Sequence, residues 1–146
     1  TSSAVGSSQS DMVKCLRGYF RVILRDEPTA ELVAKKLDSW YRERARIIFS
    51  ERLEACCHKA IREEASKPFL RIQKMTNRWG SCSKSGRIIL NLELIKAPKE
   101  CIDYVIMHEL CHLQEQHHGP RFWRLLEKLM PDYAERRKRL NLFADV

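Results

Sequence analysis

The sequence predicts an α+β fold, with a long N-terminal helix, a small and mostly antiparallel sheet packed on a histidine-bearing helix, and short C-terminal helices. Residues 29–66 contain neither proline nor glycine, which favours a long helix. Two strand-like runs, "FLRIQKM" and "RIILNLELI", lie on either side of the turn-like "SKSG". Pro98, Pro120 and Pro131 each precede a segment with apolar residues at helical spacing.

Length and composition indicate one globular domain. The chain has 146 residues, of which 44% are apolar, so it can bury one modest core. The opening "TSSAVGSSQS" lacks the basic and apolar regions of a secretory signal, and we expect residues 1–12 to be a flexible tail and 13–146 a single domain. The six cysteines form no C-x-x-C pair, which favours reduced thiols and a cytoplasmic protein. No apolar run approaches the roughly 18 residues of a membrane span.

The first half of the chain carries strand and helix signals in turn. "CLRGYFRVIL" (15–24) is rich in aromatic and branched residues and is expected to be one strand. Within 29–66, apolar residues recur at mixed three- and four-residue steps, which predicts one long helix, with a break near its middle as the alternative. The run 69–75 alternates apolar and polar residues, and 87–95 is expected to pair with it after a turn at 83–86.

The second half is expected to be helical. A helix should begin at Pro98 and end at Gly119. Its apolar face carries Ile102, Ile106, Leu110 and Leu113. Pro120 opens a short helix, and Pro131 opens the last one, which ends in the basic run "RRKR".

The segment "HELCHLQEQHHG" (108–119) holds four of the five histidines. Its first five residues match H-E-x-x-H, and residues four apart on a helix lie on the same face. His108 and His112 can therefore bind one metal ion. Glu109 lies beside that ion, where it can take a proton from bound water. The motif lies in the middle of a periodic helix, which indicates a catalytic site with one zinc ion per chain.

A catalytic zinc takes three protein ligands and leaves a fourth position for water, so a third ligand is needed. The candidates are His117, His118 and an acidic residue of a later helix, such as Glu127 or Glu135. His118 lies six residues after His112, the separation known from zinc proteases whose chain turns sharply after the second histidine. Cys111 is badly placed to reach the same ion and is expected to be a packed thiol.

Three blocks of the sequence resemble the YgjP-like metallopeptidase family: "RWGSC" (78–82), "HELCH" (108–112) and "HGPRFW" (118–123). The resemblance covers about residues 70–140. It implies a zincin-like fold in which the third zinc ligand is the histidine before "P-x-F-W", here His118, and not His117. The family looks related to SprT-like and WLM-type proteases, which use H-E-x-x-H with a later histidine.

Motif and resemblance together predict a zinc-dependent metallopeptidase that acts on a peptide or protein. Glu109 would accept the proton of a zinc-bound water and pass it to the leaving amine. A second group should stabilise the oxyanion, and the candidates are Tyr133, Tyr104, Arg78 and His117. Gly80 would let its strand approach closely, and a sheet edge there would bind a peptide through main-chain hydrogen bonds.

The charge of the chain supports a competing hypothesis. The net charge is +8, and residues 121–140 hold seven basic side chains against three acidic ones. A basic, nucleic-acid-associated module with structural or vestigial zinc would bind DNA through Arg136, Arg137, Lys138 and Arg139. By analogy with SprT-like proteases, the two hypotheses merge in a protease that acts on DNA-bound proteins. The simpler alternative is a solvated helix face.

Overall fold

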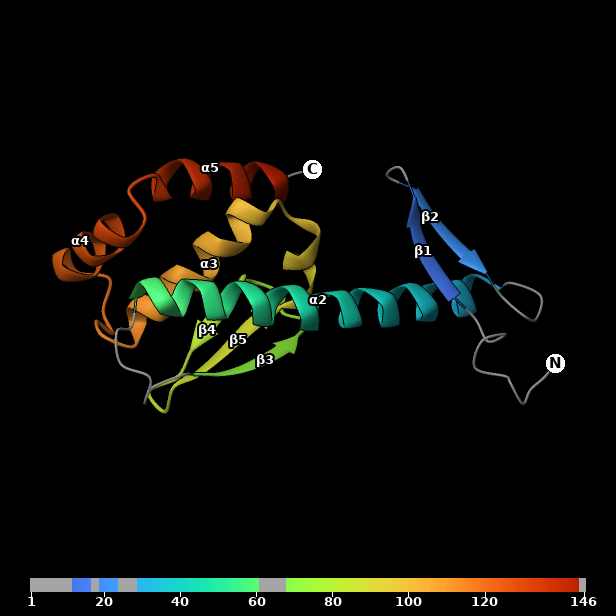
Figure 1. The fold of residues 1–146 in the computed structure, drawn as a ribbon, viewed down its shortest axis with the longest axis horizontal. Helices are drawn as coiled ribbons and strands as arrows, with labels where there is room; N and C mark the ends of the chain where they lie inside the picture. The colour runs from blue at the N-terminus through green and yellow to red at the C-terminus, as the bar shows by residue number, and fades with distance from the viewer. Residues whose placement is uncertain (1–11, 17–18, 24–28, 61–67, 145–146) are drawn as a thin grey trace. The chain divides into compact units, whose positions relative to one another are not determined.

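The structure, a computed structural model, describes residues 12–16, 19–23, 29–60 and 68–144 (Figure 1). Contacts divide the chain into two compact units, Thr1–Arg44 and Ala45–Val146. A single domain over 13–146 therefore stays a prediction. None of the described helices combines the length and the apolar character needed to cross a membrane.

The first unit contains two strands where one was predicted. β1 (Met12–Leu16) and β2 (Tyr19–Ile23) pair antiparallel, with Leu16 opposite Tyr19. The prediction of one strand over 15–24 is therefore wrong, and the glycine inside that run was the signal for an interruption. Met12 belongs to β1 and not to the predicted tail. Residues 1–11 and 17–18 lie outside the described residues.

Helix α2 (Ala30–Ala60) is continuous, so the alternative with a break near its middle is wrong. Thr29 caps its first turn, with Oγ1 accepting from the Leu32 amide at 3.0 Å. The predicted extension to residue 66 falls outside the described residues. The buried residues of α2, which recur at helical spacing, are Ala45, Phe49, Leu53 and Cys56.

The sheet of the second unit has the order β3-β5-β4, formed by β3 (Phe69–Gln73), β4 (Gly80–Cys82) and β5 (Arg87–Asn91). The predicted turn at 83–86 is confirmed, and Gly86 has the positive φ of 89° that favours glycine. This turn joins β4 to β5, whereas β3 pairs with β5 in parallel. The α+β class is confirmed, but the sheet is mixed. The short β4 was missed because it has only three residues and includes glycine and serine, which have little strand propensity.

β5 ends at Asn91, four residues before the predicted end of this strand. The Asn91 side chain accepts a hydrogen bond from the Glu93 amide at 3.0 Å, and the 3₁₀ helix η2 (Leu92–Lys96) follows. A side chain that bonds the backbone two residues on turns the chain. Asn91 Nδ2 also donates to the carbonyls of Met75 (3.0 Å) and Arg78 (2.9 Å), which fixes the segment before β4.

Helix α3 (Lys99–His112) lies between the sheet and the C-terminal helices α4 (Pro120–Leu129) and α5 (Tyr133–Ala144) (Figure 1). Arg52 of α2 binds Asp103 of α3 through two hydrogen bonds of 2.7 and 2.9 Å, which joins these helices. The predicted helix starts near Pro98, Pro120 and Pro131 are confirmed. The cysteines from the long helix onward are free: Cys56, Cys57, Cys82, Cys101 and Cys111.

Candidate metal centre

Helix α3 brings two histidines to one side of its last two turns. His108 and His112 are four residues apart, and their ring centroids lie 5.0 Å from each other. The opposite side of the helix is fixed by core residues such as Ile106 and Leu110, both fully buried. The two imidazoles are therefore presented by a helix that cannot easily rotate.

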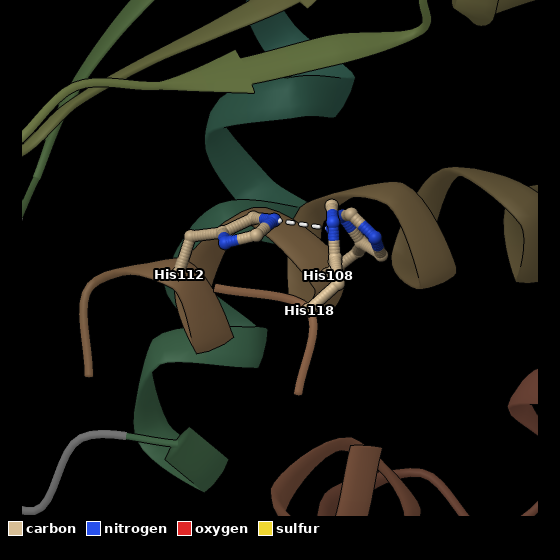
Figure 2. Close-up of side chains that lie close together, drawn as sticks. All are labelled: His108, His112 and His118. Atoms are coloured by element: carbon tan, nitrogen blue, oxygen red, sulfur yellow. Dashed lines mark hydrogen bonds between the residues drawn. The ribbon is translucent and has the colours of Figure 1, made fainter. Parts of the chain in front are cut away.

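His118 joins this pair because α3 ends at His112 and not at the predicted Gly119. In a continuing helix, residue 118 would lie about 9 Å further along the axis and on another side. Instead, Nε2 of His118 lies 2.9 Å from Nε2 of His112 (Figure 2). The three histidines each offer a ligand atom, and these atoms lie within 4.8 Å of one another.

The donor set of this cluster fits a zinc ion. Two nitrogens bound to one tetrahedral zinc lie about 3.3 Å apart, so the observed spacing needs only small side-chain movements. Partial desolvation of its ring lowers the pKa of His118, and the nearby His112 and His108 lower it further. A lower pKa favours the neutral form of histidine, which is the form that binds metal ions.

The other candidate ligands lie outside this cluster. Among the described residues, the only group of histidines, cysteines and carboxylates close enough to hold a metal comprises His108, His112 and His118. His117 is exposed and lines the hollow above the cluster. Cys111 is buried, and burial raises the pKa of its thiol to about 12, as expected for a packed side chain.

Two aromatic residues of α4 pack against the cluster, and this role was not predicted from the sequence. The buried ring of Phe122 lies 4.5–5.0 Å from the centroids of all three imidazoles. Trp123 stacks on His118 at 5.7 Å, and its Nε1 donates to the His118 carbonyl at 3.2 Å. Their position directly after "HGP" was the available signal, since the start of α4 follows His118 so closely.

Glu109 lies between the cluster and strand β4. Its side chain is buried, and Oε2 lies 3.3 Å from Nδ1 of His108. A Cβ at Gly80 would lie 3.2 Å from Cγ and 3.3 Å from Oε2 of Glu109, and 3.1 Å from Val105. The predicted close approach of the strand at Gly80 is confirmed, because any side chain there would press on the carboxylate.

The cluster opens into a hollow of about 560 Å³ that is bordered by β4. Gly80, Ser81 and Cys82 line one side, and the histidines and Glu109 line another. β4 is the edge strand of its sheet, so one row of its main-chain groups has no strand partner within the described sheet. The hollow can therefore accept an extended chain beside the three clustered imidazoles.

The four candidates for a second electrophile lie in different places. Arg78 and His117 line the hollow. Tyr104 is buried in α3, with its ring 5.9 Å from that of His108. Tyr133, at the start of α5, stacks on Trp123 at 5.8 Å and is absent from the described lining of the hollow.

The basic run at 136–139 makes contacts within the protein. Arg136 pairs with Asp132 at 3.0 Å, and Arg139 lies 3.7 Å from a Glu100 oxygen. The guanidinium of Arg137 lies over the rings of Trp123 and Tyr133. Lys138 is exposed. Three of the four side chains predicted to contact DNA are therefore engaged by neighbouring residues.

Comparison with known proteins shows which family this chain resembles. The sequence profile described as the YgjP-like metallopeptidase domain matches residues 2–143. No curated protein matches the chain. The crystal structure of the metallopeptidase zymogen of Pyrococcus abyssi abylysin is similar, with a TM-score of 0.56 and 25% identity, and the match covers 63% of this chain and 90% of that one.

The metallopeptidase zymogen of Methanocaldococcus jannaschii jannalysin gives a TM-score of 0.55 at 20% identity, covering 66% of this chain and 96% of that one. At this identity the likeness concerns the fold alone, and it agrees with the predicted zincin-like architecture. The profile match spans almost the whole chain, which therefore belongs to the YgjP-like metallopeptidase family, a family of peptide hydrolases.

Proposed function

We propose that this protein is a zinc-dependent peptidase in which His108, His112 and His118 hold the metal and Glu109 transfers protons. The observation that carries this proposal is the cluster of three imidazole ligand atoms within 4.8 Å of one another, beside a buried carboxylate. A bound zinc ion would lower the pKa of a water molecule and polarise the scissile carbonyl. Membership of a metallopeptidase family supports the same chemistry.

Glu109 is suited to accept the proton of the attacking water. It is one residue away from His108 on α3, which places its carboxylate beside the proposed ligands rather than among them. β4 covers one side of this carboxylate at Gly80, so little room is left for it to swing away. The same group would then donate the proton to the leaving amine.

The edge of β4 is the proposed binding site for the substrate. An extended peptide would add to Gly80–Cys82 as a further strand and pass over the histidine cluster. The second stabiliser of the oxyanion would come from Arg78 or His117, because both line the hollow and Tyr133 is engaged with Trp123.

The charges around the hollow favour acidic peptides. Apart from histidines, the charged residues that line it are Arg78, Lys84 and Glu109. Arg78 and Lys84 are exposed and lie two positions before and after β4, whereas Glu109 is buried. We therefore expect peptides with Asp or Glu near the scissile bond to be cleaved faster than their Lys-containing counterparts.

The test combines metal analysis with cleavage of a peptide library. Purified protein should hold about one zinc per chain. Glu109→Gln should keep this zinc but lose roughly a hundredfold to ten-thousandfold in hydrolysis, which is the usual contribution of a positioned acid and base. Glu115→Gln makes the same change of charge in the same segment and should leave hydrolysis unaffected.

Metal content comes first among these measurements because the two similar solved proteins are zymogens, and a zymogen can bind zinc before it cleaves anything. Zinc-loaded protein whose Glu109→Gln variant cleaves as fast as the wild type would contradict the proposed mechanism.

A further inference from the structure

One arginine of the basic run lies where three helices meet. The Cζ atom of Arg137 is 5.5 Å from the ring centroid of Trp123 in α4 and 5.8 Å from that of Tyr133 in α5. The guanidinium of Arg137 also lies close to the Tyr104 side chain in α3, where it opposes the rise that burial causes in the pKa of Tyr104. A single guanidinium group thus lies beside aromatic side chains from all three helices.

Trp123, which contacts Arg137, also contacts His118. Trp123 stacks on the His118 ring with an interplanar angle of 25° and donates a hydrogen bond to its carbonyl. His118 is exposed and lies in the non-helical segment between α3 and α4, so helical geometry does not hold it in place. The stack on Trp123 is therefore a main restraint on its ring.

We propose that Arg137 is a positioning residue for the metal site, which holds Trp123 against His118 and so keeps His118 turned toward His108 and His112. The inference rests on the proposed function, in which His118 is a zinc ligand. A planar guanidinium can lie flat on the Trp123 ring and still hydrogen-bond at its edge, which lysine cannot do. Outer-shell partners of this kind orient the ligands that bind the metal.

Zinc affinity, measured by competition with a chelator, tests the proposal without relying on hydrolysis. Arg137→Gln should weaken zinc binding by about tenfold, at the lower end of the range for outer-shell partners. Arg139→Gln is the matched control, because it removes the same charge from the same helix and also loses a contact to α3, at Glu100. Its zinc affinity should equal that of the wild type.

A double-mutant cycle shows whether Arg137 acts through His118. In a His118→Ala background, Arg137→Gln should cause no further loss of zinc affinity, because the side chain it positions is gone. Equal losses in both backgrounds, or an equal loss in Arg139→Gln, would overturn the proposal and indicate general loosening of α5. If His118→Ala itself leaves zinc affinity unchanged, the proposed ligand set fails together with this inference.

Arg137→Lys keeps the charge and serves if Arg137→Gln does not fold. Its zinc affinity should be nearly as low as that of Arg137→Gln, because lysine lacks the planar group that stacks on Trp123. Wild-type zinc affinity in Arg137→Lys would also overturn the proposal.

Discussion

Helix α3 and the segment that follows it supply the three clustered histidines in different ways. His108 and His112 come together through the helical repeat, on a helix whose other side is buried in the core. His118 is exposed, lies outside any helix, and is restrained by contacts with Phe122 and Trp123. The pair on α3 is therefore specified locally, whereas the third histidine depends on how α4 packs.

The largest expected effect separates the two neighbouring histidines of the second region. His118→Ala should weaken zinc binding by more than about a hundredfold, because the loss of a ligand exceeds the roughly 10–100-fold cost of losing an outer-shell partner. His117→Ala should leave zinc binding unchanged, since His117 is not part of the cluster. Zinc titration in competition with a chelator measures both variants.

The reverse result, with His117→Ala as the damaging change, would show that the segment 113–119 rearranges when it binds metal. The third ligand would then be His117, and the comparison between the two regions would hold with a different residue.

The same contrast explains what the sequence could predict. The H-E-x-x-H helix was predictable because the motif and the helical repeat both act within a few residues. The end of α3 at His112 was not predictable, because the residues that follow it are good helix formers. Contacts distant in sequence hold this region instead, including the hydrogen bond from Gln114 to the Ala60 carbonyl.

The sheet also shows how far local sequence signals can predict the structure. The turn at 83–86 carried its own signal in Gly86, but the direction in which β3 pairs depends on a three-residue strand without strand-forming residues. The choice of His118 over His117 came from a family resemblance, because spacing alone left both open. Local rules thus predicted the helix starts and the two longer strands of this sheet, while β4, the pairing and the third candidate ligand required packing information.

A smaller effect is expected from the sheet side of α3, at Gly80. Gly80→Ala would place a Cβ 3.2 Å from Cγ of Glu109 and 3.1 Å from Val105. This overpacking should lower the free energy of unfolding by about 1–3 kcal/mol. It should also slow hydrolysis by about tenfold, less than the hundredfold that a 1 Å misplacement can cost.

Gly86→Ala is the control for Gly80→Ala. It is strained by its positive φ, which costs roughly 1–2 kcal/mol, but nothing lies within 4 Å of the added Cβ. Thermal unfolding should show that both variants are destabilised, and only Gly80→Ala should lose activity on a cleavable peptide. Equal activity losses would mean that β4 does not position Glu109.

The smallest expected effect concerns nucleic acid and the outer surface of α5. A phosphate-binding patch at 136–139 would give sequence-independent DNA binding that falls steeply with salt, with about one unit of salt slope per contact. Its three arginines already contact Asp132, Glu100 or aromatic rings, so Lys138 is the side chain left to bind phosphate. We therefore expect weak DNA binding, and Lys138→Gln should flatten the salt slope by no more than about one unit. Fluorescence anisotropy at several salt concentrations measures this slope. Zinc content serves as the control, because none of the described contacts joins Lys138 to the ring stack on His118. Tight binding with a slope of several units would show that these arginines leave their partners for phosphate, and α5 would then serve DNA binding as well as packing behind His118.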